Sequence, residues 1–164
     1  MPSPGPAAPR FALLLLLAAC GAPHAGSHDA TPHDSSFAAL QARGRTAMGV
    51  DQYTSSHRFD PLPDGGRIEL QRDADDSAGV EQIRDHLRQI ARAFAAGDFA
   101  TPMFVHATDS VPGTAVMAAR RGAISYTFAP LPRGGEVRIR TTDAEALRAV
   151  HAFLAFQRGD HHVH

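Results

Sequence analysis

The sequence predicts an α+β fold in which two ββα repeats form a four-stranded antiparallel sheet with two helices packed on one face. Three observations predict it: an internal repeat, strands in which apolar and polar residues alternate, and one apolar stripe of helical period in each repeat. The chain has 164 residues, which fits a single folded domain behind an N-terminal segment.

The internal repeat is the clearest of these features. Residues 59–66 read Phe-Asp-Pro-Leu-Pro-Asp-Gly-Gly, and residues 128–135 read Phe-Ala-Pro-Leu-Pro-Arg-Gly-Gly, so six of eight positions are identical. The same offset of 69 residues also aligns Met48 with Met117 and Ser56 with Ser125. We therefore expect one domain over residues 37–160, built from copies at about 44–98 and 113–160.

Each copy begins with a strand, a hairpin and a returning strand. Prolines hinder ladder pairing and paired glycines admit positive φ, so the Pro-Leu-Pro-x-Gly-Gly segment is expected to form the hairpin connection. Ile68 and Leu70 alternate with polar residues in the first returning strand, as Val137 and Ile139 do in the second. This alternation predicts a sheet with one solvated face.

The outgoing strands predict where one histidine points. Ile124, Tyr126 and Phe128 lie two residues apart, so they share one face of the second copy. By the repeat, His57 takes the place of Tyr126 in the first copy. We therefore expect His57 to point inward.

Helices complete the predicted elements. Apolar residues at three-and-four spacing predict helices over 77–96 and 142–157, each followed by a Gly-Asp dipeptide that ends it. A short helix is expected at 36–43. Residues 99–114 contain two prolines and are expected to form an irregular link between the copies, a natural place for function.

The N-terminal segment predicts export. Arg10 precedes an apolar run over residues 11–19, which is too short to cross a bilayer and is typical of a cleavable signal peptide over residues 1–19. The run ends in Leu-Ala-Ala-Cys-Gly, a sequence that resembles the bacterial lipobox with Cys20 as the acylated residue. An ordinary secretory signal with a chance cysteine is the alternative. Residues 20–36 are small or polar and are expected to form a flexible tether.

This prediction has consequences for compartment and chemistry. Gly21 after the cysteine favours the outer membrane, facing the periplasm, in a cell envelope with two membranes. Cys20 is the only cysteine, so its acylation excludes disulfides, zinc-thiolate sites and cysteine nucleophiles from the folded domain. With 16 basic residues against 17 acidic ones, the charge balance gives no reason to expect a nucleic-acid partner.

Histidines and methionines carry the strongest chemical signal, since the chain contains ten histidines. His57, His106 and His151 are the best-placed candidate metal ligands, followed by Met103, three residues before His106, and then by His86. Imidazole and thioether donors together suit copper, and imidazoles alone also suit zinc. We therefore predict a bound transition metal, with copper favoured over zinc.

A second group of candidate ligands is less specific. Met48 and Met117 occupy equivalent places in the two copies and are expected to approach each other near the repeat axis. The chain ends in a His-rich tail over residues 161–164, whose imidazoles are His161, His162 and His164. Each candidate also has a structural interpretation: buried histidines are usually hydrogen-bonded, helix-edge ones such as His86 are usually solvated, and buried methionines usually fill space.

Signals for catalysis are sparse. The sequence contains no Gly-x-Ser-x-Gly elbow, no phosphate-binding glycine loop and no carboxylate pair whose spacing forces proximity. We would favour an enzyme only if a deep pocket joined His106 to a carboxylate such as Asp51 or Asp109.

Several motifs carry a resemblance. They are Met-Gly-Val-Asp-Gln at 48–52, Ser-His-x-Phe at 56–59, Ile-Arg-Asp-His-Leu at 83–87, Gly-Asp-Phe at 97–99, Pro-Met at 102–103, His106, Pro-Gly at 112–113 and Val-His-x-Phe at 150–153. As a set they resemble a family of small exported bacterial proteins with no established activity. In that family a second histidine is expected one turn after His86, where this chain has Gln89.

Members of this family sometimes carry the label aspartate carbamoyltransferase, which the sequence does not support. The chain is about half the length of such a catalytic subunit and lacks its Ser-Thr-Arg-Thr phosphate loop. The leading hypothesis is instead a lipid-anchored periplasmic protein that binds a transition metal for buffering or delivery, with the membrane and a metal-handling protein as partners. The alternative is a non-catalytic binding or structural module with core histidines, and an enzyme is the least favoured hypothesis.

Overall fold

The computed structural model describes residues 1–2, 5 and 32–161. The cleavage region of the expected signal peptide, Cys20, His162 and His164 lie outside the described residues. In the described part, no helix is both long and apolar enough to cross a bilayer.

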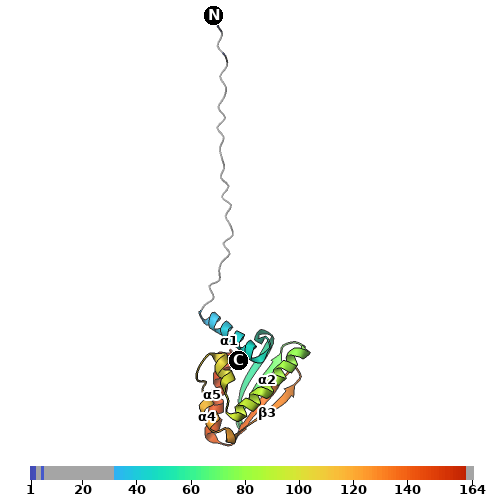
Figure 1. Cartoon of the computed structure of the whole chain (residues 1–164), viewed down its shortest axis with the longest axis vertical. Coiled ribbons are helices and arrows are strands. Elements are labelled where there is room, and N and C mark those ends of the chain that lie inside the picture. The colour runs from blue at the N-terminus through green and yellow to red at the C-terminus, as the bar shows by residue number, and fades with distance from the viewer. Residues whose placement is uncertain (3–4, 6–31, 162–164) are drawn as a thin grey trace.

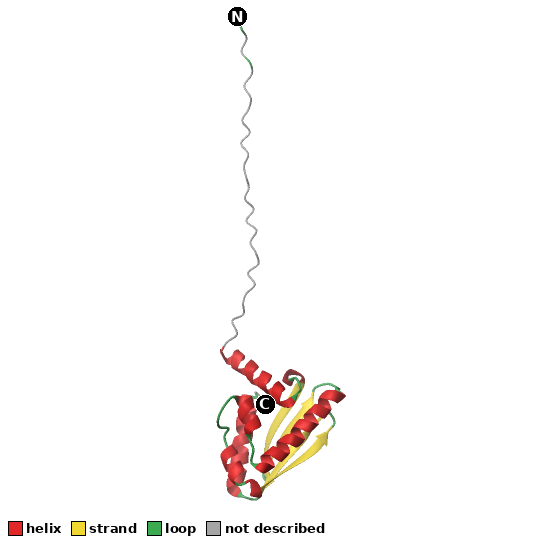
Figure 2. Cartoon of the chain, viewed as in Figure 1, coloured by secondary structure: helices red, strands yellow, loops and turns green. Residues whose placement is uncertain are grey.

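A four-stranded antiparallel sheet forms one layer of the domain (Figure 2). Its strands are β1 (Ser55–Leu62), β2 (Gly65–Arg72), β3 (Ile124–Leu131) and β4 (Gly134–Thr141), in the spatial order β1-β2-β4-β3. The two returning strands pair at the centre, with Ile68 opposite Val137. Pro61 and Pro130 lie on the edge strands, where no second neighbour needs the missing N–H. The predicted fold class is confirmed.

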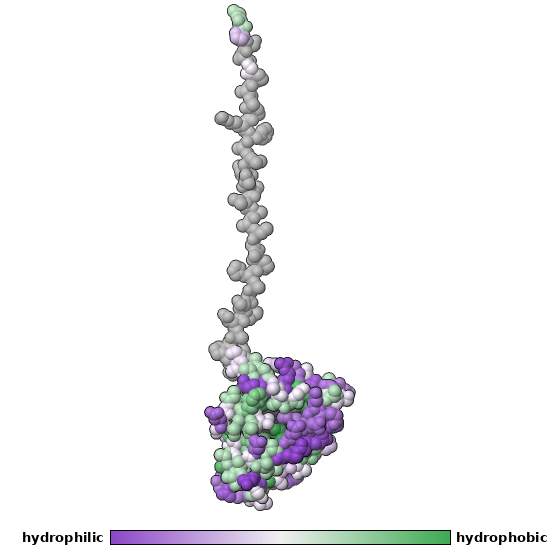
Figure 3. All heavy atoms as spheres, viewed as in Figure 1, coloured by the Kyte–Doolittle hydropathy of each residue, from purple (hydrophilic) through white to green (hydrophobic). Residues whose placement is uncertain are grey.

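Two long helices, α2 (Ser77–Ala96) and α5 (Ala144–Asp160), cover one face of the sheet (Figure 1). Each packs mainly over the strands of the other repeat: α2 lies on β3 and β4, and α5 lies on β1 and β2. The opposite face carries charged residues, among them Arg67, which forms ion pairs with Asp60, Glu69 and Glu136. In Figure 3, hydrophilic side chains also gather on the side of the view where α2 lies in Figure 1.

The repeat unit is longer than the sequence predicted. Helix α1 (Pro32–Met48) and the 3-10 turn η1 (Gln52–Thr54) precede β1, and α4 (Thr114–Ala119) and η2 (Arg121–Ala123) precede β3. The offset of 69 residues places Gln52 on Arg121, so each copy contains an α-η-β-β-α unit. The expected helix at 36–43 was too short, and the expected tether to residue 36 overlaps α1.

The link between the copies is partly helical. It contains α3 (Ala100–His106), which ends at Ala107 in the left-handed conformation, and then α4. The prolines do not prevent this, because Pro102 lies in the first turn of α3, where its missing N–H would have no helical partner. The prediction of an irregular link over 99–114 was wrong for residues 100–106 and is confirmed for residues 107–113.

The end of α5 also differs from the prediction. Helix α2 ends as expected at Gly97, which has a φ of 81°, but α5 continues through Gly159 to Asp160. The last turn of α5 is held from outside by α3, because His106 contacts both Gln157 and Asp160. The Gly-Asp dipeptide at 159–160 therefore belongs to the helix, and His161 caps it.

The two repeats are related by an approximate twofold axis. The amide of Arg72 donates to the carbonyl oxygen of Arg133, and the amide of Thr141 donates to that of Asp64, so the two bonds are equivalent under the offset of 69. The glycines of the two hairpins show the same relation. A Cβ at Gly65 would lie 2.1 Å from the Ile139 carbonyl oxygen, and a Cβ at Gly134 would lie 2.0 Å from that of Leu70. Glycine is therefore needed at both positions because any side chain would overlap the backbone of the neighbouring central strand. Positive φ was the only requirement expected from the sequence.

Candidate functional site

A cavity of about 80 Å³ lies between the β1–β2 half of the sheet and helices α1, α2, α3 and α5. Its size would admit several water molecules, at roughly 10–15 Å³ each. Most of its wall is apolar and comes from the core, and the remaining lining residues are small, amide-bearing or imidazole-bearing. The lining comprises Gly44, Ala47, Met48, Gln52, His57, Phe59, Ile68, Leu70, His86, Leu87, Ile90, Phe94, Thr101, Pro102, Val105, Phe153, Gln157 and His161.

Three imidazoles line this cavity: His57 from β1, His86 from α2 and His161 from the end of α5. His57 points inward, as predicted from the alternation of its strand. Its ring stacks on Phe59 with the ring centroids 5.7 Å apart and on His161 with the centroids 5.1 Å apart. His86, which was expected at the solvent edge, is partly buried and lines this cavity as well as a shallow pocket beside exposed Gln89 and Phe104.

Burial keeps two of these imidazoles neutral. It lowers the pKa of His57 from 6.5 to about 4, and repulsion from a protonated His86 is the second cause. Burial also lowers the pKa of His86 to about 4, against the opposing effect of a hydrogen bond with the backbone of Ala47. At neutral pH both rings are therefore uncharged, and each retains one nitrogen lone pair.

His106 lies next to the cavity but does not line it. Its ring contacts His161 edge-on, with the centroids 5.2 Å apart. Both of its nitrogens are already engaged: Nδ1 is 2.5 Å from Asp160 Oδ2, and Nε2 is 2.9 Å from Gln157 Oε1. His106 thus joins α3 to the last turn of α5, a role different from the metal ligand predicted for it.

His151 lies at a different place in the fold. Its Nε2 is 3.0 Å from the carbonyl oxygens of both Leu62 and Gly65, so it binds the β1–β2 hairpin. Arg84 on α2 does the same for the other hairpin, donating to the carbonyl oxygens of Leu131 and Gly134. Contrary to the expectation from the sequence, the structure therefore does not bring His57, His106 and His151 together in one site.

The methionines differ in their relation to the cavity. Met48 lines the cavity, whereas its repeat counterpart Met117 is fully buried in the core and does not line it. Met103 is partly buried against the core and is likewise absent from the lining. Of the predicted thioether donors, only Met48 can therefore contribute to this cavity.

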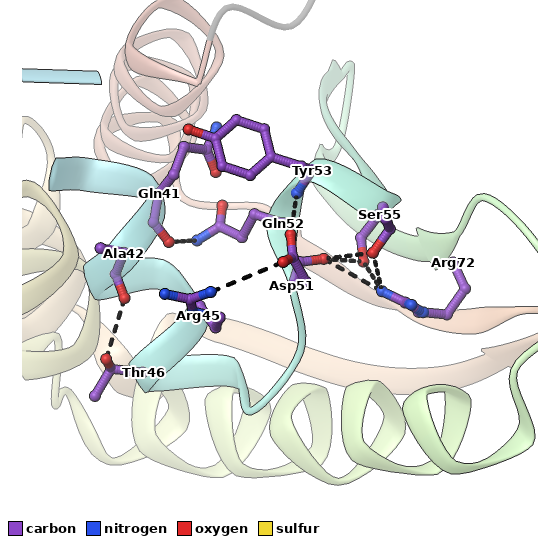
Figure 4. A network of polar contacts seen from close by, with 10 residues as sticks. Gln41, Ala42, Arg45, Thr46, Asp51, Gln52, Tyr53, Ser55 and Arg72 are labelled. Atoms are coloured by element: carbon purple, nitrogen blue, oxygen red, sulfur yellow. Dashed lines mark hydrogen bonds and ion pairs between the residues drawn. The ribbon is translucent and has the colours of Figure 1, made fainter. Parts of the chain in front are cut away.

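A polar network holds the α1 side of the cavity (Figure 4). Gln52 Nε2 donates to the backbone oxygen of Gln41, 3.3 Å away. Asp51 begins η1 by accepting from the Tyr53 amide and lies 3.8 Å from Arg45. The condition set above for an enzyme was a deep pocket that joins His106 to a carboxylate such as Asp51 or Asp109; His106, its partner Asp160, Asp51 and Asp109 do not line this cavity.

Gly44 makes room for the Gln52 side chain. A Cβ at residue 44 would lie 1.2 Å from Gln52 Nε2, which is incompatible with the position of that amide. Two polar atoms of the lining, Gln52 Oε1 and Gln157 Nε2, are buried without a hydrogen-bond partner among the described residues. Such atoms are costly to bury unsatisfied, so they identify places where a bound molecule or ion with its water could be held.

The donor set has clear limits as a metal site. Within residues 32–161, no three side chains drawn from His, Cys, Asp and Glu form a group that could hold a metal ion. A site in this cavity would need two imidazoles and the thioether of Met48, or a small movement of the three imidazoles. This is the coordination number that Cu(I) accepts and that Zn(II) in structural sites does not.

Comparisons with protein-family models, with curated proteins and with solved structures return no match to this chain. The resemblance to a family of exported proteins stays a prediction.

Sequence reasoning missed the position of His161, although a signal for it exists. The α2 stripe of Ile83, Leu87, Ile90 and Phe94 matches Val150, Leu154, Gln157 and His161 at an offset of 67 residues. In the structure, Phe94 packs on Tyr126 with the centroids 5.8 Å apart, and His161 packs on His57. The cavity therefore lies where one repeat has imidazoles in place of an aromatic core pair.

Proposed function

We propose that this chain is a lipid-anchored protein of the bacterial cell envelope that binds a transition metal, copper in preference to zinc, for buffering or delivery. The observation that carries the proposal is the convergence of His57, His86 and His161 on one cavity that also exposes Met48. Imidazole and thioether are the donors that bind copper when thiolates are absent.

The site would consist of His57 and His86 with Met48 as first ligands and His161 as a further imidazole. His106 would act through His161, because the two rings are in contact and His106 is fixed by Asp160. Fixed supporting partners of this kind orient the ligands of metal sites. His151 and Met117 have no part in this proposal.

A titration with Cu(I) tests the proposal. We would use a background chain in which Cys20 is replaced by Ser and His24, His28, His33, His162 and His164 are replaced by Ala, so that the thiol and the imidazoles of the terminal segments cannot bind. Cu(I) would be supplied under ascorbate in competition with a chromogenic chelator. We expect one Cu(I) per chain, with affinity lowered at least tenfold in H57A and in H86A.

The matched control is H151A, which removes an imidazole of the same domain outside the cavity. We expect it to bind Cu(I) as the background chain does. No retention of Cu(I) by the background chain, or equal retention by H57A and H86A, would contradict the proposal.

The proposed anchor has its own test. In a bacterial host, the chain should incorporate labelled palmitate and fractionate with membranes, whereas C20S should do neither. Labelling of C20S, or membrane association without labelling of the unmodified chain, would contradict acylation at Cys20.

A binding module for a small organic molecule is the second candidate function. It is favoured by the mainly apolar wall and by the buried Gln52 Oε1 and Gln157 Nε2, which could accept from and donate to such a ligand. Phenol, which has an apolar ring and one hydroxyl group, is a suitable probe. Chemical-shift changes confined to the cavity in the metal-free chain, combined with no Cu(I) binding, would favour this candidate.

A further inference from the structure

The geometry points to a site that selects its ion by charge: we infer that the cavity takes a monovalent soft cation, Cu(I) or Ag(I), and rejects Cu(II), Zn(II) and Ni(II). The inference rests on the proposed function, since it concerns the same site.

In the part of the chain that the structure describes, the wall of the cavity carries no charged carboxylate, ammonium or guanidinium group. None of the described residues that line the cavity is Asp, Glu, Lys, Arg or Cys. An ion in the cavity would therefore meet neutral donors only, and its full charge would remain uncompensated by first ligands.

Charged side chains lie just behind the wall of the cavity. Asp160 lies nearby and is paired with His106. On the α1 side, Arg43 Nε donates to the backbone oxygen of Val105, a lining residue, at 2.7 Å. Asp51 on the same side is paired with Arg45. The carboxylates named here are thus already engaged, and Arg43 adds a positive charge, so these groups supply no net negative charge for a divalent ion.

Dehydration is more costly for a divalent ion than for a monovalent one. Transfer of an ion from water to a medium of low dielectric constant costs an energy that rises with the square of its charge, so a divalent ion of similar size loses about four times as much as a monovalent one. The apolar side chains of Phe59, Leu70 and Ile90 form much of the wall and cannot solvate the ion. The penalty therefore falls most heavily on Zn(II), Ni(II) and Cu(II).

The donor set of the cavity also favours a soft monovalent ion. Two imidazoles and one thioether satisfy an ion that prefers soft ligands and low coordination numbers. Zn(II) takes four ligands in most structural sites, and Cu(II) takes nitrogen and oxygen ligands in a tetragonal arrangement. Charge and coordination number therefore select in the same direction.

Competition between ions tests the inference. Ag(I) is a redox-inert probe for the monovalent soft class, and its binding to the background chain would be measured calorimetrically beside that of Zn(II) and Cu(II). We expect one Ag(I) per chain, bound at least a hundredfold more tightly than Zn(II), with the difference lost in H57A.

A variant that adds a carboxylate to the wall sharpens the test. Gln157 and Glu have nearly the same shape, so Q157E introduces a negative charge with little change in volume. We expect Q157E to bind Zn(II) and Cu(II) at least tenfold more tightly than the background chain, while Q82E, an exposed change on α2, has no effect.

The outcomes separate the inference from the proposed function. Zn(II) bound as tightly as Ag(I), in a manner that depends on His57, would overturn the inference and leave metal binding in place. Failure of every ion to bind would overturn the proposed function and the inference with it. Unchanged Zn(II) affinity in a folded Q157E chain would show that wall charge does not decide selection, and would overturn the inference as well.

Discussion

The histidines of the folded domain have different roles because each meets different neighbours. His57 and His86 face an apolar cavity, His106 is held between a carboxylate and an amide, and His151 binds a hairpin. A buried imidazole without a charged partner stays neutral, whereas one beside backbone oxygens donates to them. The residue type alone does not distinguish these roles.

The lowered pKa values predict a loss of stability in mild acid for the metal-free protein. Folded His57 and His86 titrate near pH 4, while unfolded histidine titrates near 6.5, so the unfolded chain binds more protons between these values. The free energy of unfolding should therefore be highest above pH 6.5 and should decrease as the pH falls toward 4. Each imidazole whose pKa is lowered to about 4 should account for a decrease of roughly 3 kcal/mol. Urea unfolding at several pH values, in the presence of a chelator, measures this.

The variants H57L and H86L provide the control for this prediction. Each should have a flatter dependence of unfolding free energy on pH between 4 and 6.5, because one shifted group is removed. Dependence as steep as that of the unmodified chain in both variants would contradict the assignment to these residues.

Removal of His151 should affect stability and leave the cavity intact. Its Nε2 serves two carbonyl oxygens of the β1–β2 hairpin, so H151A should lower the free energy of unfolding by about 1–2 kcal/mol. R84M, at the equivalent place on α2, should have a loss of similar size. A drop in Cu(I) affinity for H151A comparable to that of H57A would show that its role is not confined to the hairpin.

At the level of elements, α1 and the last turn of α5 close the cavity that the sheet and α2 begin. Gly44 of α1 and His161 at the end of α5 line the same cavity. Local sequence signals predicted only residues 36–43 of α1 and did not predict the last turn of α5. Helix α1 carries a glycine in its interior, and α5 passes through a glycine near its end, so packing against neighbouring elements decides both.

The glycine in α1 provides a test of this packing. Alanine is favoured over glycine inside a helix by about 1 kcal/mol, yet a Cβ at residue 44 would overlap the Gln52 amide. We therefore expect G44A to lower the free energy of unfolding by about 1–3 kcal/mol, because the buried amide must move.

The matched control is G159A in α5, where a Cβ would meet no atom within 4 Å. It should raise the free energy of unfolding by about 0.5 kcal/mol. Thermal unfolding of both variants, followed by circular dichroism, gives the two changes. A stabilising G44A would contradict the described position of Gln52.

At the level of the whole molecule, the approximate twofold axis relates an aromatic pair in one half to an imidazole pair in the other. On one side Tyr126 packs on Phe94, and burial raises the pKa of Tyr126. On the other side His57 packs on His161 beside the cavity. The duplicated fold therefore contains its own reference for what this site would be without imidazoles.

The double variant H57Y/H161F introduces the Tyr126–Phe94 type of aromatic pair at the position of His57 and His161. We expect the free energy of unfolding of this variant to be higher by about 1–2 kcal/mol, because an aromatic pair replaces buried imidazoles. We also expect it to lose Cu(I) binding. Calorimetric unfolding and the chelator competition measure the two effects, and a variant that keeps full Cu(I) affinity would contradict the location of the site.

Much of the fold could be predicted from the sequence because it depends on local periodicity. The alternation around Ile68 and Val137 predicts strands, and the stripe from Ile83 to Phe94 predicts α2 with the bounds that the structure has. The repeat at Phe59 and Phe128 predicts the two halves. These patterns record which face of each element is buried, and burial is the largest favourable contribution to folding.

Only the tertiary structure decided which side chains meet. The sheet order β1-β2-β4-β3 and the crossing of each helix to the other repeat bring His161 to His57 and take His151 to a hairpin. The sequence alone limited the donors of any metal site in the folded domain to imidazole, thioether and carboxylate groups, since it offers no thiol beyond Cys20. It could not determine which donors converge, because that depends on contacts between elements far apart in the chain, about which local periodicity carries no information.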